Sequence, residues 1–160
     1  MQIFKRVYLG LGANLGDPVQ QIIDARVKLI SLKCVHAWTS SSMYLSSPVG
    51  YADQANFINC VLALDIDNEL IAEEFFAHVQ KIETDLGRVR DSGNQNAPRK
   101  IDVDVLLFAD QVINLKKLLI PHPRMAQRLF VIEPLNELGV DIKKDKNTDF
   151  SQQEIFKLAI

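Results

Sequence analysis

Residues 101–108 constrain the fold more than any other part of this 160-residue chain. Six of the eight residues are apolar, and they occupy both alternating sets of positions, which is typical of a strand covered on both faces. We therefore expect a central strand of a sheet. The expected faces are Ile101, Val103, Val105 and Leu107 on one side, and Asp102, Asp104, Leu106 and Phe108 on the other.

The segments around this strand alternate between strand and helix patterns. Strands are expected at residues 3–10, 34–45 and 56–66, and helices after Asp17-Pro18 and from about Asn68 to Leu86. This order, strand, helix, strand, strand, helix, strand, predicts an α+β ferredoxin-like sandwich with a mainly antiparallel sheet flanked by helices. We expect a single domain over residues 1–160.

The remaining segments are expected to be loops and short elements. Loops are predicted at 46–54 and 87–98, a turn at 110–111 leads toward a hairpin, and a helix is predicted at 124–138. The polar tail ends in a more apolar stretch, residues 150–158, for which we expect a last short helix.

Composition excludes several classes of protein. No apolar run approaches the roughly 18 residues of a membrane span, and the start of the chain lacks the features of a secretory signal, so we expect a cytoplasmic protein and no membrane partner. Cys34 and Cys60 have neither zinc-site spacing nor the density of a disulfide framework, and we expect buried free thiols.

The positive charge is concentrated in one part of the chain. The net charge of -2 argues against general nucleic-acid binding, yet nine of the 18 Lys and Arg residues lie between Lys81 and Arg128, and none lies between residues 34 and 80. Such a distribution suits a compact polyanion such as a nucleoside triphosphate.

Asp102 and Asp104 are the strongest chemical signal. Two residues apart in a strand, they point to one face about 6.6 Å apart along the backbone. Paired carboxylates beside basic residues suggest magnesium that carries phosphates. The alternative is a structural ion pair with Arg99 or Lys100.

The other candidate motifs are weaker. Arg88, Arg90 and Arg99 flank the 87–98 loop and could bind phosphate, although a single Arg is more often a solvated surface charge. Gly10, Gly12 and Gly16 do not have the spacing of a dinucleotide fingerprint, and the chain contains no phosphate-binding G-x-x-x-x-G-K-[ST] loop.

Several ordered motifs resemble the 6-hydroxymethyl-7,8-dihydropterin pyrophosphokinase family of the folate pathway. They cover most of the chain. They are Gly-Leu-Gly-Ala-Asn-Leu-Gly from Gly10, Ser-Pro-Val-Gly from Ser47, Phe-Ile-Asn from Phe57, Gln80-x-x-Glu83, Gly-Arg-Val-Arg from Gly87, Ala-Pro-Arg-Lys-Ile-Asp-Val-Asp-Val-Leu from Ala97, Ile-Pro-His-Pro from Ile120, and Arg128-x-Phe130.

The resemblance implies a role for each matching residue. Asp102 and Asp104 correspond to the ligands of two Mg²⁺ ions, and Arg88 and Arg99 join them as catalytic residues. The implied ATP-binding residues are Gln80, Glu83, Arg90, Arg99, Val105, His122 and Arg128. The implied pterin-binding residues are Ser47, Pro48, Val49, Gly50, Phe57, Asn59 and Phe130, with the two phenylalanines as a ring-stacking pair. Without the resemblance, Phe57 and Phe130 would be ordinary core residues and His122 a structural histidine.

The resemblance also implies the reaction: pyrophosphate passes from ATP to the pterin hydroxymethyl group, and AMP leaves. The loop at 87–98 would close as a lid, and we expect a monomer that binds no nucleic acid. Two rivals remain, a non-catalytic ferredoxin-like module that binds RNA or protein, and a kinase that transfers only the γ-phosphoryl group.

Overall fold

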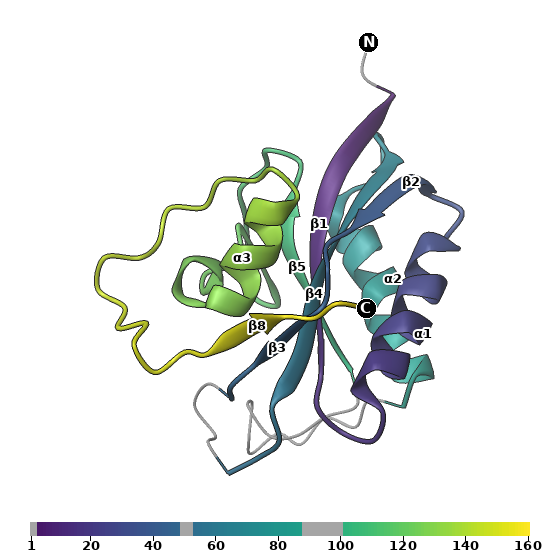
Figure 1. The fold of residues 1–160 in the computed structure, drawn as a ribbon. Coiled ribbons are helices and arrows are strands. Elements are labelled where there is room, and N and C mark those ends of the chain that lie inside the picture. The colour runs from purple at the N-terminus through teal and green to yellow at the C-terminus, as the bar shows by residue number, and fades with distance from the viewer. Residues whose placement is uncertain (1–2, 49–52, 88–100) are drawn as a thin grey trace.

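The structure is a computed structural model that describes residues 3–48, 53–87 and 101–160 (Figure 1). Over these residues the chain forms a main sheet of six strands, a separate two-stranded sheet and three α-helices. The elements are β1 (Phe4–Ala13), α1 (Pro18–Ile30), β2 (Val35–Ser40), β3 (Tyr44–Ser46), β4 (Phe57–Asp67), α2 (Ala72–Asp85), β5 (Asp102–Phe108), β6 (Ile113–Leu115), β7 (Leu118–Ile120), a 3₁₀ turn η1 (Met125–Gln127), α3 (Leu129–Glu137) and β8 (Ile155–Lys157).

The main sheet has the order β5-β1-β4-β3-β8, and β2 also pairs with β4. Every pairing is antiparallel. If β2 and β3 are taken as one interrupted strand, then β5, β1, β4 and β2/β3 have the connectivity of a ferredoxin-like sandwich. The predicted fold class is confirmed.

Helices cover the two faces of the sheet unequally. Helices α1 and α2 lie side by side on one face, where they bury the larger apolar core, and α3 lies alone on the other face (Figure 1). The smaller core under α3 consists of Val61, Leu106, Val131 and Leu135. One short helix cannot cover a whole sheet face, so part of this face is left for other uses.

The prediction that residues 101–108 form a central strand is wrong. β5 lies at the end of the strand order and pairs only with β1 among the described residues. Its free edge is covered by other groups. The Val103 N–H donates to the buried Glu83 carboxylate of α2 at 3.1 Å, and the Leu106 carbonyl accepts from the His122 N–H at 2.9 Å. An edge strand that other groups cover can have the same apolar sequence pattern as a central strand.

A β-bulge changes which side chains of β5 face which layer. The pairing with β1 passes from Leu9 opposite Val105 to Tyr8 opposite Leu107, so Leu106 is the extra residue. Asp102, Asp104 and Leu106 stay on the α3 face as predicted. Phe108, in contrast, joins the core on the α1 and α2 side, and Leu107 is only half-buried.

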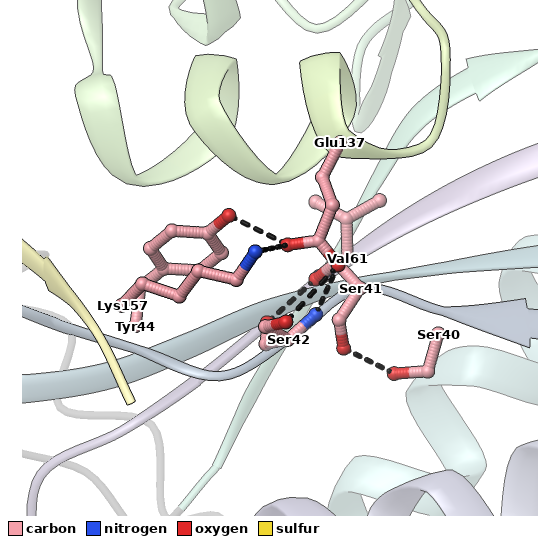
Figure 2. A network of polar contacts seen from close by, with 7 residues as sticks. All are labelled: Ser40, Ser41, Ser42, Tyr44, Val61, Glu137 and Lys157. Carbon is pink, nitrogen blue, oxygen red and sulfur yellow. Dashed lines mark hydrogen bonds and ion pairs between the residues drawn. The ribbon is translucent and has the colours of Figure 1, made fainter. Parts of the chain in front are cut away.

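The expected helix at 150–158 is also wrong. Residues Ile155–Lys157 form β8, which extends the sheet by pairing with β3. The Glu137 carboxylate at the end of α3 reinforces this junction (Figure 2). It accepts hydrogen bonds from the Tyr44 hydroxyl at 2.6 Å, the Ser42 N–H at 2.7 Å and the Ser42 hydroxyl at 3.1 Å, and the Lys157 ammonium lies 3.6 Å away. Strand pairing and the Glu137 carboxylate thus both connect the tail to the rest of the fold.

The helix and hairpin predictions hold with shifted boundaries. Helix α1 begins at Pro18, and the Asp17 carboxylate accepts from the Gln20 N–H at 3.1 Å, as its sequence indicated. Helix α2 begins at Ala72 rather than near Asn68. The hairpin is β6 with β7, and the helix at 124–138 is divided into η1 and α3.

Two further predictions can be compared with the described residues. Both cysteines are free, but only Cys60 is buried and Cys34 is half-buried. In the part of the chain that the structure covers, no helix has the length and apolar character needed to cross a membrane.

Candidate active site

A cavity lies on the α3 face of the sheet, beside the start of α3. About 650 Å³ of empty space lies among its walls, and part of this space is open solvent. Its described walls are Gly10, Leu11, Gly12, Ser47, Phe57, Asn59, Cys60, Asp102, Asp104, Leu106, Arg128, Phe130 and Val131. Strands β1, β4 and β5 form the floor, and α3 closes one end.

The floor follows from the register of three strands. Gly12 of β1 lies opposite Asp102 of β5 on one side and opposite Asn59 of β4 on the other, while Gly10 lies opposite Asp104. Residues paired directly across an antiparallel ladder share a face. The two carboxylates and the amide therefore project to one side of the sheet, separated by strand positions that have no side chain.

Position 12 requires glycine because a larger residue would not fit there, and not because of its backbone dihedral angles. A Cβ at position 12 would lie 2.7 Å from Asn59 Oδ1, whereas a Cβ at position 10 would meet Leu106 at an ordinary 3.5 Å. Asn59 itself is buried, and its side-chain N–H₂ donates to Ser46 Oγ at 2.6 Å. The glycine and the serine together fix the orientation of the Asn59 amide.

His122 approaches the aspartates from the segment after β7. Its Nε2 lies 4.0 Å from Asp104 Oδ2, and its Nδ1 accepts from the Arg124 backbone N–H at 3.2 Å. Burial, together with the positive charges of Arg128 and Arg124, lowers the pKa of His122 to about 4 against an opposing contribution from Asp102. The ring is therefore neutral at pH 7 with its proton on Nε2, so it presents an N–H donor on the side of the aspartates.

The carboxylates fit Mg²⁺ that binds together with a phosphate chain. Among the described residues, no group of three or more His, Cys, Asp and Glu side chains gathers around one point. Asp102 and Asp104 would thus supply only part of an octahedral shell. Mg²⁺ is commonly held by one or two carboxylates while phosphate oxygens and water complete its coordination.

The start of α3 adds a cation and an aromatic ring to the cavity wall. The Arg128 guanidinium lies 5.5 Å from the centre of the Phe130 ring, and both are half-buried. Phe57, also half-buried, comes from the beginning of β4. Two aromatic side chains from different elements line one cavity, as required for a pair of rings that holds a flat ligand.

Comparison with known proteins identifies the family. The model of the 7,8-dihydro-6-hydroxymethylpterin-pyrophosphokinase (HPPK) family matches residues 8–140. The chain belongs to this family. It is 38% identical over 147 residues to a 2-amino-4-hydroxy-6-hydroxymethyldihydropteridine pyrophosphokinase of Bacillus subtilis, and the match covers 92% of this chain and 86% of the relative. It is 40% identical over 144 residues to the Pseudomonas aeruginosa protein of the same name, covering 88% and 85%.

Solved structures agree at the level of the fold. A Plasmodium falciparum HPPK-DHPS triple mutant superposes with a TM-score of 0.66 at 14% sequence identity. That match covers 91% of this chain but only 42% of the larger chain. At this identity the likeness supports the pyrophosphokinase fold and nothing finer.

The structure brings together part of the predicted site of this pyrophosphokinase. The predicted residues that line the cavity are Ser47, Phe57, Asn59, Asp102, Asp104, Arg128 and Phe130. His122 lies beside these residues, with its Nε2 4.0 Å from Asp104 Oδ2. Pro48 is half-buried and directly follows Ser47 in the chain.

Besides His122, three described residues predicted to bind ATP are not among the walls of the cavity. Val105 is buried in the core on the α1 and α2 side, and Glu83 is buried with its carboxylate on the Val103 N–H. Gln80 is half-buried on α2, and its carbonyl accepts from the Thr84 hydroxyl at 3.1 Å. Their roles toward nucleotide stay predictions.

Five predicted residues lie outside the described residues: Val49, Gly50, Arg88, Arg90 and Arg99. The lid predicted at 87–98 falls there too, except for Gly87. Sequence reasoning, in turn, gave the cavity-lining Leu11, Cys60 and Val131 no place in the site. The side chains of Leu11 and Cys60 belong to the core under α1 and α2, so their backbone borders the cavity floor. Val131 has no signal in sequence that separates a cavity wall from a core.

Proposed function

We propose that the cavity is where this pyrophosphokinase binds the pterin and transfers pyrophosphate to it. As a member of its family, the chain is an ATP-dependent enzyme of folate biosynthesis that transfers pyrophosphate from ATP to the hydroxymethyl group of 6-hydroxymethyl-7,8-dihydropterin. One observation supports the location most: Asp102, Gly12 and Asn59 form one row across three strands, so carboxylates and a hydrogen-bonding amide face the same space.

The pterin would lie between Phe57 and Phe130. A flat ring system gains from two aromatic faces, about 0.5 to 1.5 kcal/mol per pair beyond the burial of area. The fixed Asn59 amide would read the polar edge of the ring, with the backbone from Ser47 to Gly50 as its partner. Such preorganised hydrogen bonds discriminate strongly between ligands, because an analogue without the matching groups leaves buried polar atoms unpaired.

Asp102 and Asp104 would hold two Mg²⁺ ions together with the triphosphate. These ions would supply positive charge at the oxygens that enter and leave the transferred group. The protein itself contributes placement, because the strand fixes both carboxylates at one edge of the pterin pocket.

Arg128 and His122 would contribute hydrogen-bond donors to the phosphates. The guanidinium is held above the Phe130 ring, and the neutral imidazole keeps its Nε2 proton directed toward the aspartates. We assign the remaining ATP-binding roles to Gln80, Glu83, Arg90, Arg99 and Val105, and the second catalytic arginine to Arg88, on the motif matches alone. Positioned donors of this kind stabilise charge that develops during phosphoryl transfer.

We also propose that the enzyme acts as a monomer and binds no nucleic acid. The sequence supports a monomer because one chain contains every matched motif. It argues against nucleic-acid binding because it predicts no broad basic face. Sedimentation velocity at micromolar concentration tests the first proposal, and a shift assay with short RNA tests the second.

The experiment that tests the function measures the product of a single turnover. Purified protein, labelled ATP, Mg²⁺ and the hydroxymethyl pterin should give AMP and the pterin pyrophosphate. ADP as the nucleotide product would instead indicate a γ-phosphoryl kinase.

A second experiment tests the location of the site. Asn59→Leu should raise the KM for pterin at least about tenfold with little change in the KM for ATP. An equal rise in the KM values of both substrates would contradict the proposal that the pterin binds in this cavity.

A further inference from the structure

Residues 153 and 154 lie beyond the last residue matched by the family model, yet they contact two parts of the cavity wall. Gln153 contacts the start of α3, and Glu154 contacts the end of β3. Because the two are consecutive, these parts of the wall are connected through one peptide unit and the Gln153 side chain. We call residues 153–154 the C-terminal strap.

The Gln153 side chain makes two hydrogen bonds across Arg128. Its Oε1 accepts from the Leu129 N–H at 2.9 Å, and its Nε2 donates to the Gln127 carbonyl at 2.9 Å. The Arg128 side chain makes no capping hydrogen bond at this helix start. The amide of Gln153 therefore satisfies a terminal N–H of α3 and sets the backbone that carries Arg128 and Phe130.

The Glu154 backbone makes two hydrogen bonds to Ser47. The Ser47 N–H donates to the Glu154 carbonyl at 3.0 Å, and the Glu154 N–H donates to Ser47 Oγ at 3.0 Å. Ser47 directly follows β3, whose last residue, Ser46, holds the Asn59 amide. The strap thus contacts the first residue of the predicted pterin-reading backbone.

We propose that Gln153 and Glu154 position the pterin pocket by holding the start of α3 and the end of β3 at one fixed separation. The hydrogen bonds that the strap makes outside the tail go to Gln127, Leu129 and Ser47. These bonds support two parts of the pterin pocket but, among the described residues matched to ATP, only the backbone of Arg128, so loss of the strap should weaken pterin binding more than ATP binding. This inference rests on the proposed location of the pterin between Phe57 and Phe130.

The test compares Gln153→Leu with Gln152→Leu. Gln152 is its exposed neighbour, and the structure gives its side chain no hydrogen bond among the described residues. Gln153→Leu should raise the KM for pterin about tenfold, the scale of one or two lost hydrogen bonds. Because Gln153 also supports the backbone of Arg128, the KM for ATP should rise too, but by no more than about threefold, with kcat within about twofold. Gln152→Leu should match wild type. A role in stability alone would reduce the amount of active enzyme, so kcat would fall and both KM values would stay unchanged.

A double-mutant cycle with Ser47→Ala makes the test sharper. Ser47→Ala removes only the Oγ acceptor and keeps the backbone, and it should raise the KM for pterin about threefold. Because either change loosens the same strap, the double variant should show about a tenfold rise rather than the roughly thirtyfold rise of independent sites. Thermal melting of each variant verifies that the protein is folded at the assay temperature. If Gln153→Leu does not fold, Ser47→Ala with an unchanged KM for pterin overturns the proposal.

The outcomes separate this inference from the proposed function. If wild type releases AMP with pterin but Gln153→Leu keeps the wild-type KM for pterin, the strap does not position the pocket. An additive cycle overturns the proposal equally. If wild type forms no AMP in the presence of pterin, the proposed function fails, and the strap inference fails with it.

Discussion

Gly12 illustrates how a single residue shapes this site. Its place in a strand between Asp102 and Asn59 leaves an open position where any other residue would put a Cβ against the Asn59 amide. In sequence the glycines near the start of the chain looked like a weak dinucleotide motif. Gly10 and Gly12 instead line the cavity floor, where the lack of a side chain leaves space beside the aspartates and Asn59.

Gly12→Ala should therefore damage pterin binding. The new methyl group would force the Asn59 amide to move, and overpacking of this kind costs about 1 to 3 kcal/mol. We expect the KM for pterin to rise about tenfold or more. Gly10→Ala is the matched control, because its Cβ meets Leu106 at a normal distance and should change the KM by no more than about threefold. Similar effects of the two substitutions would argue against steric control by Gly12.

Asp104→Ala should abolish turnover without unfolding the protein. Removal of the carboxylate takes away a proposed metal ligand, and the loss of one charge-positioning group lowers kcat by on the order of 10² to 10³ or more. The apoprotein should melt at the same or a slightly higher temperature, because repulsion between two carboxylates is relieved. AMP release measured over a Mg²⁺ titration tests this, with the exposed Asp110→Ala as control. Near-normal turnover at moderate Mg²⁺ would refute the metal assignment.

At the scale of elements, the outer edge of β5 is covered by α2. Glu83 of α2 is buried, and its carboxylate accepts from the Val103 N–H on the side where the described residues supply no further strand. The element that carries Asp102 and Asp104 is thus held on one side by the β1 ladder and on the other by a side chain. An edge strand without such cover would leave buried backbone groups unpaired.

Glu83→Leu should destabilise the fold by about 1 to 3 kcal/mol, since it leaves the Val103 N–H without its acceptor. Glu83→Gln retains an acceptor oxygen and should cost less. Glu74→Leu, an exposed position on the same helix, is the control. Urea unfolding followed by circular dichroism gives these values. The edge-cover interpretation is wrong if Glu83→Leu and Glu74→Leu have the same free energy of unfolding.

The junction of α3, β3 and β8 should depend on pH through Glu137 (Figure 2). Burial raises the pKa of Glu137, but hydrogen bonds from Tyr44 and Ser42 and the charge of Lys157 outweigh it and leave the pKa below its usual value. The unfolded chain therefore binds this proton more readily. Glu137 stabilises the fold above its unfolded pKa, and this contribution is lost as pH falls through the folded pKa.

Wild type should consequently be more stable than Glu137→Gln at neutral pH, and the difference should shrink from about pH 5 downwards. Melting temperatures of both proteins between pH 7 and pH 3 measure it. Glu69→Gln, an exposed position, should follow wild type throughout. A constant difference between wild type and Glu137→Gln at all pH values would show that the ionised carboxylate is not the stabilising form.

At the scale of the whole molecule, the two substrates should bind cooperatively. The pterin site and the proposed metal site share one cavity floor, so nucleotide with Mg²⁺ would add contacts for the pterin hydroxymethyl group. We expect pterin to bind at least about tenfold more tightly with a non-hydrolysable ATP analogue and Mg²⁺ present, a coupling of about 1.4 kcal/mol. Calorimetry with and without the analogue measures this, and equal affinities would exclude the coupling.

The sequence alone was sufficient for the fold class and for the residues with the strongest local signals. Alternation between helical and strand periods predicted the ferredoxin-like order, and Asp17-Pro18 predicted the start of α1. The spacing of Asp102 and Asp104 put both on one face, because strand alternation is a local property. Ordered motifs indicated the family, which the comparisons confirm.

The tertiary structure decided what depends on contacts between distant segments. No local pattern could show that β5 lies at an edge, because Glu83 and the segment around His122 cover it. The bulge at Leu106 arises from pairing with β1, so alternation alone misplaced Phe108. The tail at 155–157 is a strand only because β3 offers it an edge, and the strap contacts of Gln153 and Glu154 follow from that pairing. Strand pairing between distant segments, unlike the periodicity of one segment, cannot be predicted from a local sequence pattern.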